Sequence, residues 1–475
     1  MAPTDPNPQA GFALLSELAD SEIAWLRENG EVRSCEPGAL LVREGTRIET
    51  LYVVLSGVLS ITIGGAEGRE IAKLGPGQII GEMSFLEDRP ASASVRSLEG
   101  SEVLALPRAV MEEKLRQDPA FSSHLYRGLA IVTSRRLRDV VGKLERWLGE
   151  QPVAEEETLA RWSAIARQTQ EFKARIVAAG KSSAETDGAE MAISLRAFAA
   201  AMDGAIGPTS PETIDAREEL GARIQRELLS YFLKASTPAR IYDKPRGYPA
   251  DFRAMEMIYA NQPAGQAPVG HLVDEAFLSL PSIAARRSGR ALLQEQLRRT
   301  VDEAAQKPVR ITSVGSAPGA ELRGLAAARP ADVEATFVEF DEEALAWMRA
   351  HHVGARVRLE QESLVNLALA SRKIDLEGQD FVYSMLISSF SDRSAIGLLN
   401  YLHGLLRPGG WAWVGGLHPS NPDKTFLAHI LGWSIAHRDE DAIKSLFERS
   451  AFGRACENIV TEEQGIFYLA GCQKT

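Results

Sequence analysis

The spacing of apolar residues changes twice along the chain, and each change marks a different kind of fold. From Cys35 to Leu106, short apolar runs alternate with glycine turns, which predicts a small β-sandwich or barrel. From residue 143 to about residue 240 the period is helical, with a break at Gly204–Pro211. From Val309 onward, strands alternate with helices, which is typical of an α/β domain with a mainly parallel sheet. A chain of 475 residues is also too long for one hydrophobic core.

We therefore predict a multidomain chain divided at 1–142, 143–240 and 241–475. Helices over Leu14–Asn29 and Met111–Val141 are expected to flank the β-rich segment. The helical middle region could cover a site in the third domain or build a homodimer, and the sequence does not choose between them. The strands expected in the third domain read VRITSVG, EATFVEF, ARVRLEQ, QDFVYSML, GWAWVGGL and GIFYLAGC.

Composition excludes several classes of function. A net charge of −11 and a pI near 5.4 argue against broad binding of nucleic acid and against binding of anionic lipid through a polybasic segment. Cys35, Cys456 and Cys472 are far apart and fit no metal spacing or disulfide framework, which favours a reducing compartment and no metal site. The first residues do not read as a signal peptide, and no apolar run reaches the ~18 residues of a membrane helix. We expect a cytoplasmic protein.

The β-rich segment resembles a cyclic-nucleotide-binding domain over residues 12–140. The residues that carry the resemblance are EPGALLVREG, LSGVLSI and LGPGQIIGEMSFLEDRPASASV. In that family the last stretch binds the cyclic phosphate with backbone N–H groups at the start of a short helix, and a glutamate binds the ribose. The resemblance places this role on Gly81 and Glu82, with Ser92 in the same cassette.

One residue of that cassette departs from the family pattern. The family reads Pro-Arg before its small residues, and the arginine neutralises the phosphate. Here the sequence reads Pro90-Ala91-Ser92, so the expected arginine is absent. Arg89 and Arg96 are the candidate substitutes, although neighbouring positions on extended chain point elsewhere. Two interpretations stay open: the domain binds a nucleotide effector, or it is retained for packing or dimerisation.

The segment VRITSVGSAPGAELRGLA predicts a strand, a glycine turn and a helix. Gly315 and Gly319 allow backbone to approach a ligand at the carboxyl end of the strand. Glu339 ends the next strand, about twenty residues on, where a carboxylate can accept hydrogen bonds from both ribose hydroxyls. Asp341 follows at the start of a helix, where the macrodipole favours negative charge.

This order of elements, together with the turn LRPGG, resembles the class I S-adenosylmethionine-dependent methyltransferases over residues 300 to 475. The resemblance implies a Rossmann-like fold and S-adenosyl-L-methionine as the methyl donor. By position it places Gly315, Ser316 and Gly319 at the amino-acid part of the donor and Glu339 at its ribose. Glu362 or Ser363 would then lie at the adenine.

The stretch IYDKPRGYPADF places many hydrogen-bonding side chains in a segment that two prolines keep from being regular helix. With HPSNPDKTFLAHILGWSIAHRDED it resembles the methyltransferases linked to 3-hydroxypalmitic acid methyl ester, a bacterial quorum signal. That resemblance rests on Lys244, Pro245, Gly247, Tyr248 and Asp251, while Ala250 replaces a glycine. We expect Lys244 and Arg246 to bind an acceptor carboxylate, and Tyr242 and Tyr248 to exclude water beside the donor.

Methylation of a small, fatty-acid-like carboxylate fits these residues, because a carboxylate is already a nucleophile and needs no general base. A hydroxyl or amine acceptor would need a base, and His418 in GLHPSNP is the candidate, although a hydrogen-bonded loop histidine is the favoured interpretation. A third reading is a sensor that binds the donor without turnover. Trp433 is expected to serve packing.

Overall fold

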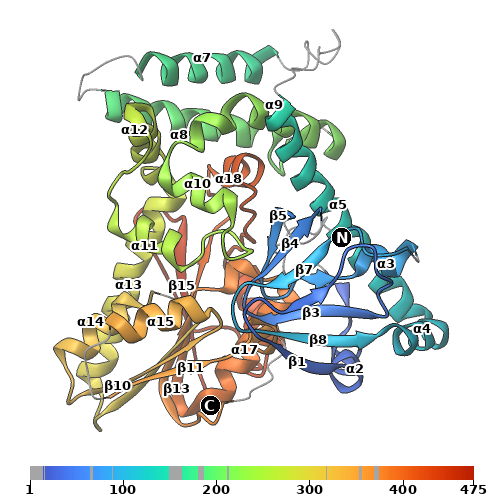
Figure 1. The fold of residues 1–475 in the computed structure, drawn as a ribbon. Coiled ribbons are helices and arrows are strands. Elements are labelled where there is room, and N and C mark those ends of the chain that lie inside the picture. Colours follow the sequence, from blue (N-terminus) through green and yellow to red (C-terminus); the bar gives the residue numbers. More distant parts are fainter. Residues whose placement is uncertain are drawn as a thin grey trace.

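A computed structural model describes residues 14, 17–64, 68–87, 89–148, 163–179, 187–210, 213–316, 318–351, 356–368 and 374–475. Figure 1 shows three parts: a β-rich domain at the N-terminus, a helical layer at the top, and an α/β domain at the C-terminus. The predicted multidomain fold class is confirmed. Parts of the helices predicted at Leu14–Asn29 and of the break at Gly204–Pro211 lie outside the described residues.

The N-terminal domain is a sandwich of two four-stranded sheets, ordered β1-β8-β3-β6 and β2-β7-β4-β5. The short helix expected after Gly81 is confirmed as α3, which begins at Glu82. Two helices, rather than the single one expected over Met111–Val141, leave the sandwich. The elements are α2 (Asp20–Asn29), β1 (Glu31–Cys35), β2 (Leu40–Val42), β3 (Thr50–Ser56), β4 (Leu59–Ile63), β5 (Arg69–Leu74), β6 (Ile79–Ile80), α3 (Glu82–Glu87), β7 (Ser94–Ser97), β8 (Ser101–Pro107), α4 (Arg108–Gln117) and α5 (Pro119–Leu148).

The helical layer forms one core on both sides of residue 240. Buried residues of α7, α8 and α9 pack with those of α10, α12 and α18 (Lys424–Leu431), so the middle region is joined to the C-terminal domain. The stacked rings of Phe172 and Phe198, with centroids 5.0 Å apart, lie inside this core. The helices are α7 (Ser163–Ala179), α8 (Asp187–Ile206), α9 (Ile214–Phe232), α10 (Ser236–Asp243), α11 (Phe252–Ala260), α12 (Ala267–Leu278) and α13 (Pro281–Glu303).

The C-terminal domain contains a seven-stranded sheet in the order β11-β10-β9-β12-β13-β15-β14. The first five of these strands pair in parallel, whereas β15 is antiparallel to both β13 and β14. All six predicted strands are present, and β14 is an additional one. The strands are β9 (Val309–Val314), β10 (Val333–Glu339), β11 (Val357–Gln361), β12 (Gln379–Ser384), β13 (Leu406–Leu417), β14 (Asn458–Thr461) and β15 (Phe467–Gln473).

The connections of this sheet create a topological switch point between β9 and β12. From β9 the chain proceeds outward to β10 and β11, then returns to β12 on the other side of β9. Ligands of such sheets bind in the crevice beyond the carboxyl ends of the strands at this point. The helices of the domain are α14 (Ala320–Ala328), α15 (Glu342–His351), α16 (Leu364–Ala368), α17 (Asp392–Leu405), α18 (Lys424–Leu431) and α19 (Glu440–Arg449), with a 3₁₀ turn, η3, at Ile387–Ser389.

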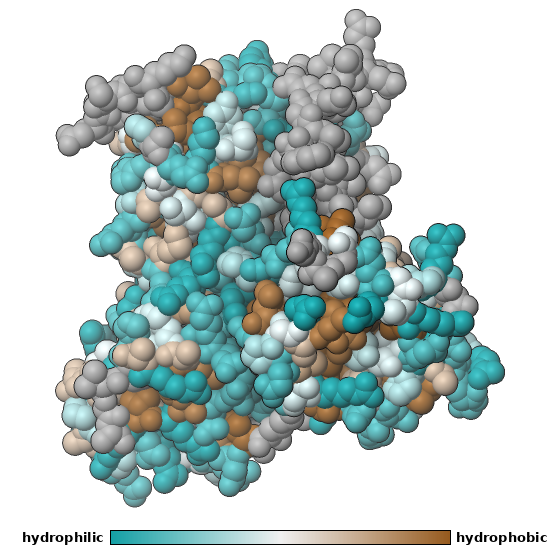
Figure 2. Space-filling view, viewed as in Figure 1, coloured by the Kyte–Doolittle hydropathy of each residue, from teal (hydrophilic) through white to brown (hydrophobic). Residues whose placement is uncertain are grey.

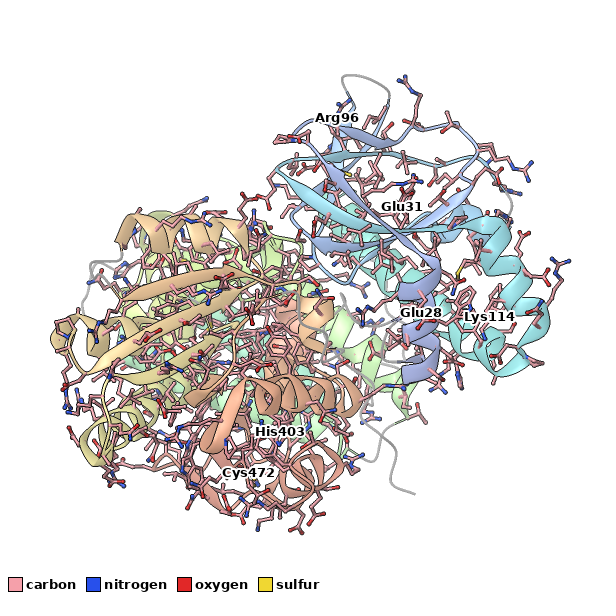
Figure 3. The ribbon with its side chains drawn as sticks, turned by 90° about the horizontal axis from the view of Figure 1, so that it is seen from below. Glu28, Glu31, Arg96, Lys114, His403 and Cys472 are labelled. Carbon is pink, nitrogen blue, oxygen red and sulfur yellow. The ribbon has the colours of Figure 1, made fainter. Side chains whose placement is uncertain are left out.

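The N-terminal domain shares a hydrophobic core with the sheet domain. Buried Leu51 and Val53 of β3 belong to the same apolar cluster as Leu367 and Ala368 of α16. Seen from below, the two domains lie side by side, with Arg96 in one and His403 in the other (Figure 3). Figure 2 shows apolar surface on the N-terminal domain, whose exposed large apolar residues are Val32, Leu40, Ile63, Met83, Leu86, Leu98 and Tyr126. Within the described parts of the chain, no helix combines the length and apolar character that a membrane span requires.

Candidate functional site

A cavity lies at the switch point, beyond the carboxyl ends of β9, β10 and β12. It brings together Gly315, Ser316 and Glu339, which the sequence assigned to one donor site. The loop before α11 closes one side through Tyr248, Pro249 and Ala250. The remaining lining residues are Phe252, Met255, Tyr259, Arg286, Phe340, Met385, Leu386, Ser388, Ser389, Trp433, Ile435 and Phe467.

The glycine loop after β9 is fixed by its neighbours. Gly315 has φ +59°, and a Cβ there would lie 2.2 Å from Leu386 Cδ1, so a side chain at this position would have to displace Leu386. Ser316 Oγ accepts the N–H of Met385 at 3.0 Å, which ties the β9 loop to the β12 loop. Gly319, also at φ +59°, begins α14 against Phe337 and is not among the residues that line the cavity.

Glu339 is a buried carboxylate, 2% exposed, that borders the cavity at the end of β10. Its Oε1 accepts the backbone N–H of Phe340 at 2.8 Å and that of Asp341 at 3.3 Å, so the backbone fixes its orientation. On the adjacent strand end, the N–H of Glu362 donates to the carbonyl of Glu339 at 3.0 Å. This hydrogen bond joins the end of β10 to the residue that follows β11.

Glu362 and Ser363 are both buried, and their side chains accept hydrogen bonds from the first turn of α16. Glu362 Oε1 accepts from Asn366 Nδ2 at 2.7 Å, and Ser363 Oγ accepts the backbone N–H of Asn366 at 3.0 Å. Neither is among the residues that line the cavity. In this conformation their side chains hold the helix that packs on β3 of the N-terminal domain.

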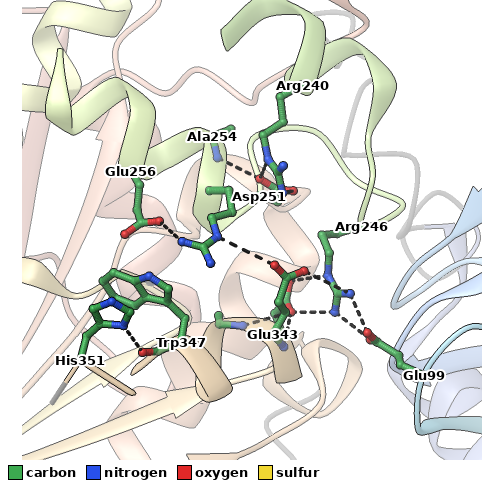
Figure 4. Close-up of polar contacts among 12 residues, drawn as sticks. Glu99, Arg240, Arg246, Asp251, Ala254, Glu256, Glu343, Trp347 and His351 are labelled. Atoms are coloured by element: carbon green, nitrogen blue, oxygen red, sulfur yellow. Dashed lines mark hydrogen bonds and ion pairs between the residues drawn. The ribbon is translucent and has the colours of Figure 1, made fainter. Parts of the chain in front are cut away.

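The loop from Lys244 to Asp251 has an unusual backbone. Lys244, Gly247 and Ala250 all have positive φ, at 49°, 80° and 52°. Asp251 anchors its end, because its carboxylate accepts two hydrogen bonds from Arg240, at 2.8 and 2.7 Å, and caps α11 through the N–H of Ala254 (Figure 4). Positive φ costs energy at the two residues that carry side chains, so the surrounding contacts must hold the loop.

Tyr248 connects this loop to the end of β10. Its hydroxyl donates to Asp341 Oδ2 at 2.7 Å, and its ring packs 5.6 Å from that of Phe340. Removal from water, and next the negative charges of Asp341 and Glu339, raise the pKa of Tyr248 well above its usual value. The hydroxyl therefore keeps its proton at neutral pH and stays a donor.

Arg246 differs from the expected acceptor clamp, because its guanidinium is already bound to two carboxylates. It donates to Asp341 at 3.0 and 2.7 Å and to Glu99 of the N-terminal domain at 2.7 Å from each terminal nitrogen (Figure 4). Burial by itself would lower the pKa of Arg246, but Glu99 and Asp341 raise it above its usual value. The residue is a buried bridge between two domains.

The backbones of the two domains also meet at this bridge. Gln78 Nε2 donates to the carbonyl of Gly247 at 2.8 Å. A Cβ on Gly75 would lie 2.5 Å from the carbonyl oxygen of Arg246, and one on Gly247 would lie 2.2 Å from the nitrogen of Gly75. Neither glycine can therefore be replaced by a larger residue without moving the two backbones apart.

Three further predicted site residues also lie outside the cavity lining. Tyr242 packs against the helical core. Lys244 points toward the end of α18, where its Nζ lies 3.3 Å from the place of a Cβ on Gly432, and a cation there suits the helix dipole. His418 lines a second cavity with Glu440 and Tyr468, and its Nδ1 lies 2.8 Å from Ser420 Oγ.

Sequence reasoning missed Arg286 and Tyr259 and assigned Trp433 to packing alone. Trp433 is 2% exposed, belongs to the helical core and also lines the cavity. The guanidinium of Arg286 lies 4.7 Å from the centre of its ring. A half-buried helix arginine carries no local sequence signal, since its distance from the strand ends is set by packing.

In the N-terminal domain, the ribose-binding position is already engaged. Glu82, 4% exposed, forms an ion pair with Arg136 of α5 at 2.5 Å. Ala91, where the family has arginine, is buried in the apolar core of the sandwich. Arg89 and Ser92 are exposed, as is Arg96, whose guanidinium donates to the carbonyl of Gly38. Gly81 has φ +90°, and the expected cassette helix begins at the next residue, Glu82.

The described residues contain no group of three or more histidine, cysteine, aspartate or glutamate side chains that could hold a metal ion.

Two family models match separate parts of the chain. Residues 32–118 match the family "Cyclic nucleotide-binding domain", and residues 210–345 match the family "Putative methyltransferase". The chain therefore carries an N-terminal cyclic-nucleotide-binding domain and, after it, a domain of that methyltransferase family. The second match includes Glu339, Asp341 and the loop that contains Arg246.

Curated relatives cover only part of the chain. The cyclic AMP receptor protein of Thermus thermophilus is 33% identical over 131 residues, which are 27% of this chain and 59% of that protein. Glutaminase 2 of Bradyrhizobium diazoefficiens is 33% identical over 125 residues, 26% of this chain and 20% of the relative. The chain thus spans less than two thirds of either relative.

Solved structures match over similar lengths. A cyclic nucleotide-binding domain from Methylobacillus flagellatus is 23% identical and covers 29% of this chain and 77% of that one, with a TM-score of 0.26. The N-terminal domain of a transcriptional regulator from Streptomyces coelicolor is 31% identical and covers 26% and 86%, with a TM-score of 0.24.

Proposed function

We propose that this protein is an S-adenosylmethionine-dependent methyltransferase that converts a small, fatty-acid-like carboxylate into its methyl ester. The observation that supports this most is the meeting of Gly315, Ser316 and Glu339 in one cavity at the switch point of the sheet. We retain the division at 1–142, 143–240 and 241–475, and a cytoplasmic location, as part of the proposal.

The residues at the cavity fit the proposed donor. Glu339 presents a buried carboxylate that can accept hydrogen bonds from ribose hydroxyls, and the backbone fixes its orientation. Gly315 lines the cavity without a side chain of its own, so a ligand can approach the backbone there. S-adenosylmethionine, when bound, supplies a methyl group on positively charged sulfur.

The remaining walls suit an apolar acceptor. Phe252, Met255, Phe467 and Ile435 line the cavity, so an alkyl chain could replace water there. A carboxylate oxygen would form the new bond to the methyl carbon while sulfur keeps the electron pair of the broken bond, and no proton has to be removed. The chain's task is then to align the reacting atoms and to exclude water.

The alternative acceptors receive less support. A hydroxyl or amine acceptor would need a base, and His418 lines the other cavity, with Glu440 and Tyr468. A sensor that binds the donor without turnover would need no apolar acceptor walls.

We further propose that the N-terminal domain regulates this site. Arg246 joins Glu99 to Asp341, and the N–H of Asp341 donates to Glu339 at the cavity. β3 also packs on α16, next to Glu362. A shift of the N-terminal domain would therefore pull on two adjacent strand ends of the donor site. The effector would be a nucleotide bound at this domain, and the exposed apolar residues of the domain could serve a homodimer.

The test is turnover of S-adenosylmethionine to S-adenosylhomocysteine with a panel of fatty acids, among them 3-hydroxypalmitate, and with matched alcohols and amines. We expect product with at least one acid, identified as a methyl ester by mass spectrometry. Turnover with only alcohols or amines would remove the carboxylate assignment, and donor binding without any turnover would favour the sensor.

A further inference from the structure

The cavity lining contains a cationic side chain, that of Arg286, to which the proposed reaction assigns no role. Arg286 lies on the second turn of α13 and lines the same cavity as Gly315 and Glu339. Tyr259 and Trp433 line the cavity beside it. The end of the cavity that contains Arg286 is thus walled by two aromatic residues.

Arg286 is the arginine among the residues that line the cavity, and the protein does not pair it. Within the described ranges, none of its nitrogen atoms donates a hydrogen bond to the chain, and no carboxylate oxygen lies within 4 Å of it. Its Nε is fully buried. The adjacent Arg287, by contrast, donates to the carbonyls of Leu278 at 2.9 Å and Ile258 at 3.4 Å.

The side chain is nevertheless held in place. Its guanidinium lies 4.7 Å from the ring centre of Trp433, which is almost fully buried. A guanidinium over an indole ring is attracted by the ring, which restrains the side chain without using its N–H donors. The carboxylate whose charge acts on Arg286 is that of Asp423. Its Oδ2 accepts the N–H of Ser282 at 2.9 Å, and its buried Oδ1 has no hydrogen-bond partner among the described residues, so it does not pair with Arg286.

We propose that Arg286 binds the carboxylate of a ligand in this cavity. A buried N–H without an acceptor costs free energy, and a planar carboxylate matches the fork of an arginine. The inference rests on the proposed function, in which both reactants carry a carboxylate: the amino-acid end of the donor and the acid that accepts the methyl group. Arg286 would then fill the role that the sequence gave to Arg246, which is bound to Glu99 and Asp341.

Calorimetry on the full chain separates the two sources. S-adenosylhomocysteine has the amino-acid carboxylate, 5′-methylthioadenosine lacks it, and 3-hydroxypalmitate stands for the acceptor. We expect Arg286→Gln to lose about 10- to 100-fold in affinity for either S-adenosylhomocysteine or 3-hydroxypalmitate. 5′-Methylthioadenosine should bind both proteins equally, which shows that the variant still folds. Arg286→Lys should recover part of the loss.

Arg299→Gln is the matched control, because Arg299 lies on the same helix with a side chain 61% exposed and paired to Glu295. Loss of S-adenosylhomocysteine affinity assigns Arg286 to the donor, and loss of fatty-acid affinity assigns it to the acceptor. If Arg286→Gln lowers the affinity for neither S-adenosylhomocysteine nor 3-hydroxypalmitate, the inference is wrong. This holds whether or not the wild type binds the fatty acid. If methyl transfer fails with every acid while the loss of S-adenosylhomocysteine affinity stands, the proposed reaction falls and the role of Arg286 remains.

Discussion

The bridge between the two domains can be measured by a double-mutant cycle on Glu99 and Arg246. Glu99→Ala removes both hydrogen bonds that Arg246 donates to Glu99, each 2.7 Å long. Arg246 is 9% exposed at its side chain and Glu99 is 25% exposed, so the pair lies between a buried and a surface ion pair. Charge-assisted hydrogen bonds contribute ~1.5–3 kcal/mol. Because water reaches Glu99, we expect a coupling free energy near the lower end, about 2 kcal/mol.

The assay has two readouts. Urea unfolding of wild type, Glu99→Ala, Arg246→Ala and the double variant gives the coupling in stability. Calorimetry with S-adenosylmethionine gives the coupling to the cavity, where Glu99→Ala should weaken binding by up to about 30-fold, the equivalent of that free energy. Glu87→Ala is the control, since Glu87 is exposed on the same domain and lies 3.8 Å from Arg89.

The two readouts can fail separately. A coupling free energy near zero in urea would mean that the bridge adds nothing, and the reasoning from its geometry would be wrong. A coupling of the expected size with unchanged donor affinity would keep the bridge as a structural contact and remove the proposed regulation through Arg246.

Three further predictions concern single residues. Glu339→Ala should weaken S-adenosylmethionine affinity at least tenfold, since charge-assisted bonds are lost at ~1.5–3 kcal/mol, while circular dichroism shows that the fold persists; unchanged affinity by calorimetry would move the donor elsewhere. The wild type should bind cyclic AMP and cyclic GMP weakly or not at all, and titration should show stronger binding for Ala91→Arg; tight binding by the wild type would contradict the reasoning from the missing arginine. Burial, and then the charge of Lys424, lower the pKa of His437 in the folded protein to about 3. Between about pH 6.5 and pH 3 the unfolded chain therefore binds a proton that the folded protein does not. The free energy of unfolding falls as the pH drops through this range. His437→Gln should flatten that fall by up to about 1.4 kcal/mol per pH unit in urea unfolding, and an unchanged slope would contradict the burial argument.

Local pattern was enough to predict most of the fold. The strands of the sheet read as apolar runs between turns, and all six expected strands formed. β14 was not predicted, because Asn458–Thr461 is a short edge strand that is exposed at both ends. Its position depends on pairing with β15. The expected turn at Pro408–Gly410 lies within β13, because the N–H of Gly409 bonds to the carbonyl of Lys474 near the chain end.

The candidate site was less predictable, because its contacts are long-range. Gly315 and Glu339 follow successive strands of a parallel sheet, so their proximity can be inferred from topology. Arg246 meets Glu99 across 147 positions, and no local pattern announces a contact of that kind. Arg286 was missed for the same reason: a helical arginine beside Trp433 is identified by packing alone.

The close approach of Gly75 and Gly247 has a consequence for how such a chain can evolve. Gly247 has φ +80° and needs glycine for its own backbone, but Gly75 has no such need and is restricted by its partner domain alone. A cyclic-nucleotide-binding domain transplanted onto this methyltransferase would have to bring glycine at that position or dock differently. The set of domains that could replace this one by recombination is therefore limited by the need for glycine at position 75. A Cβ methyl group there would be the first clash in a chimera.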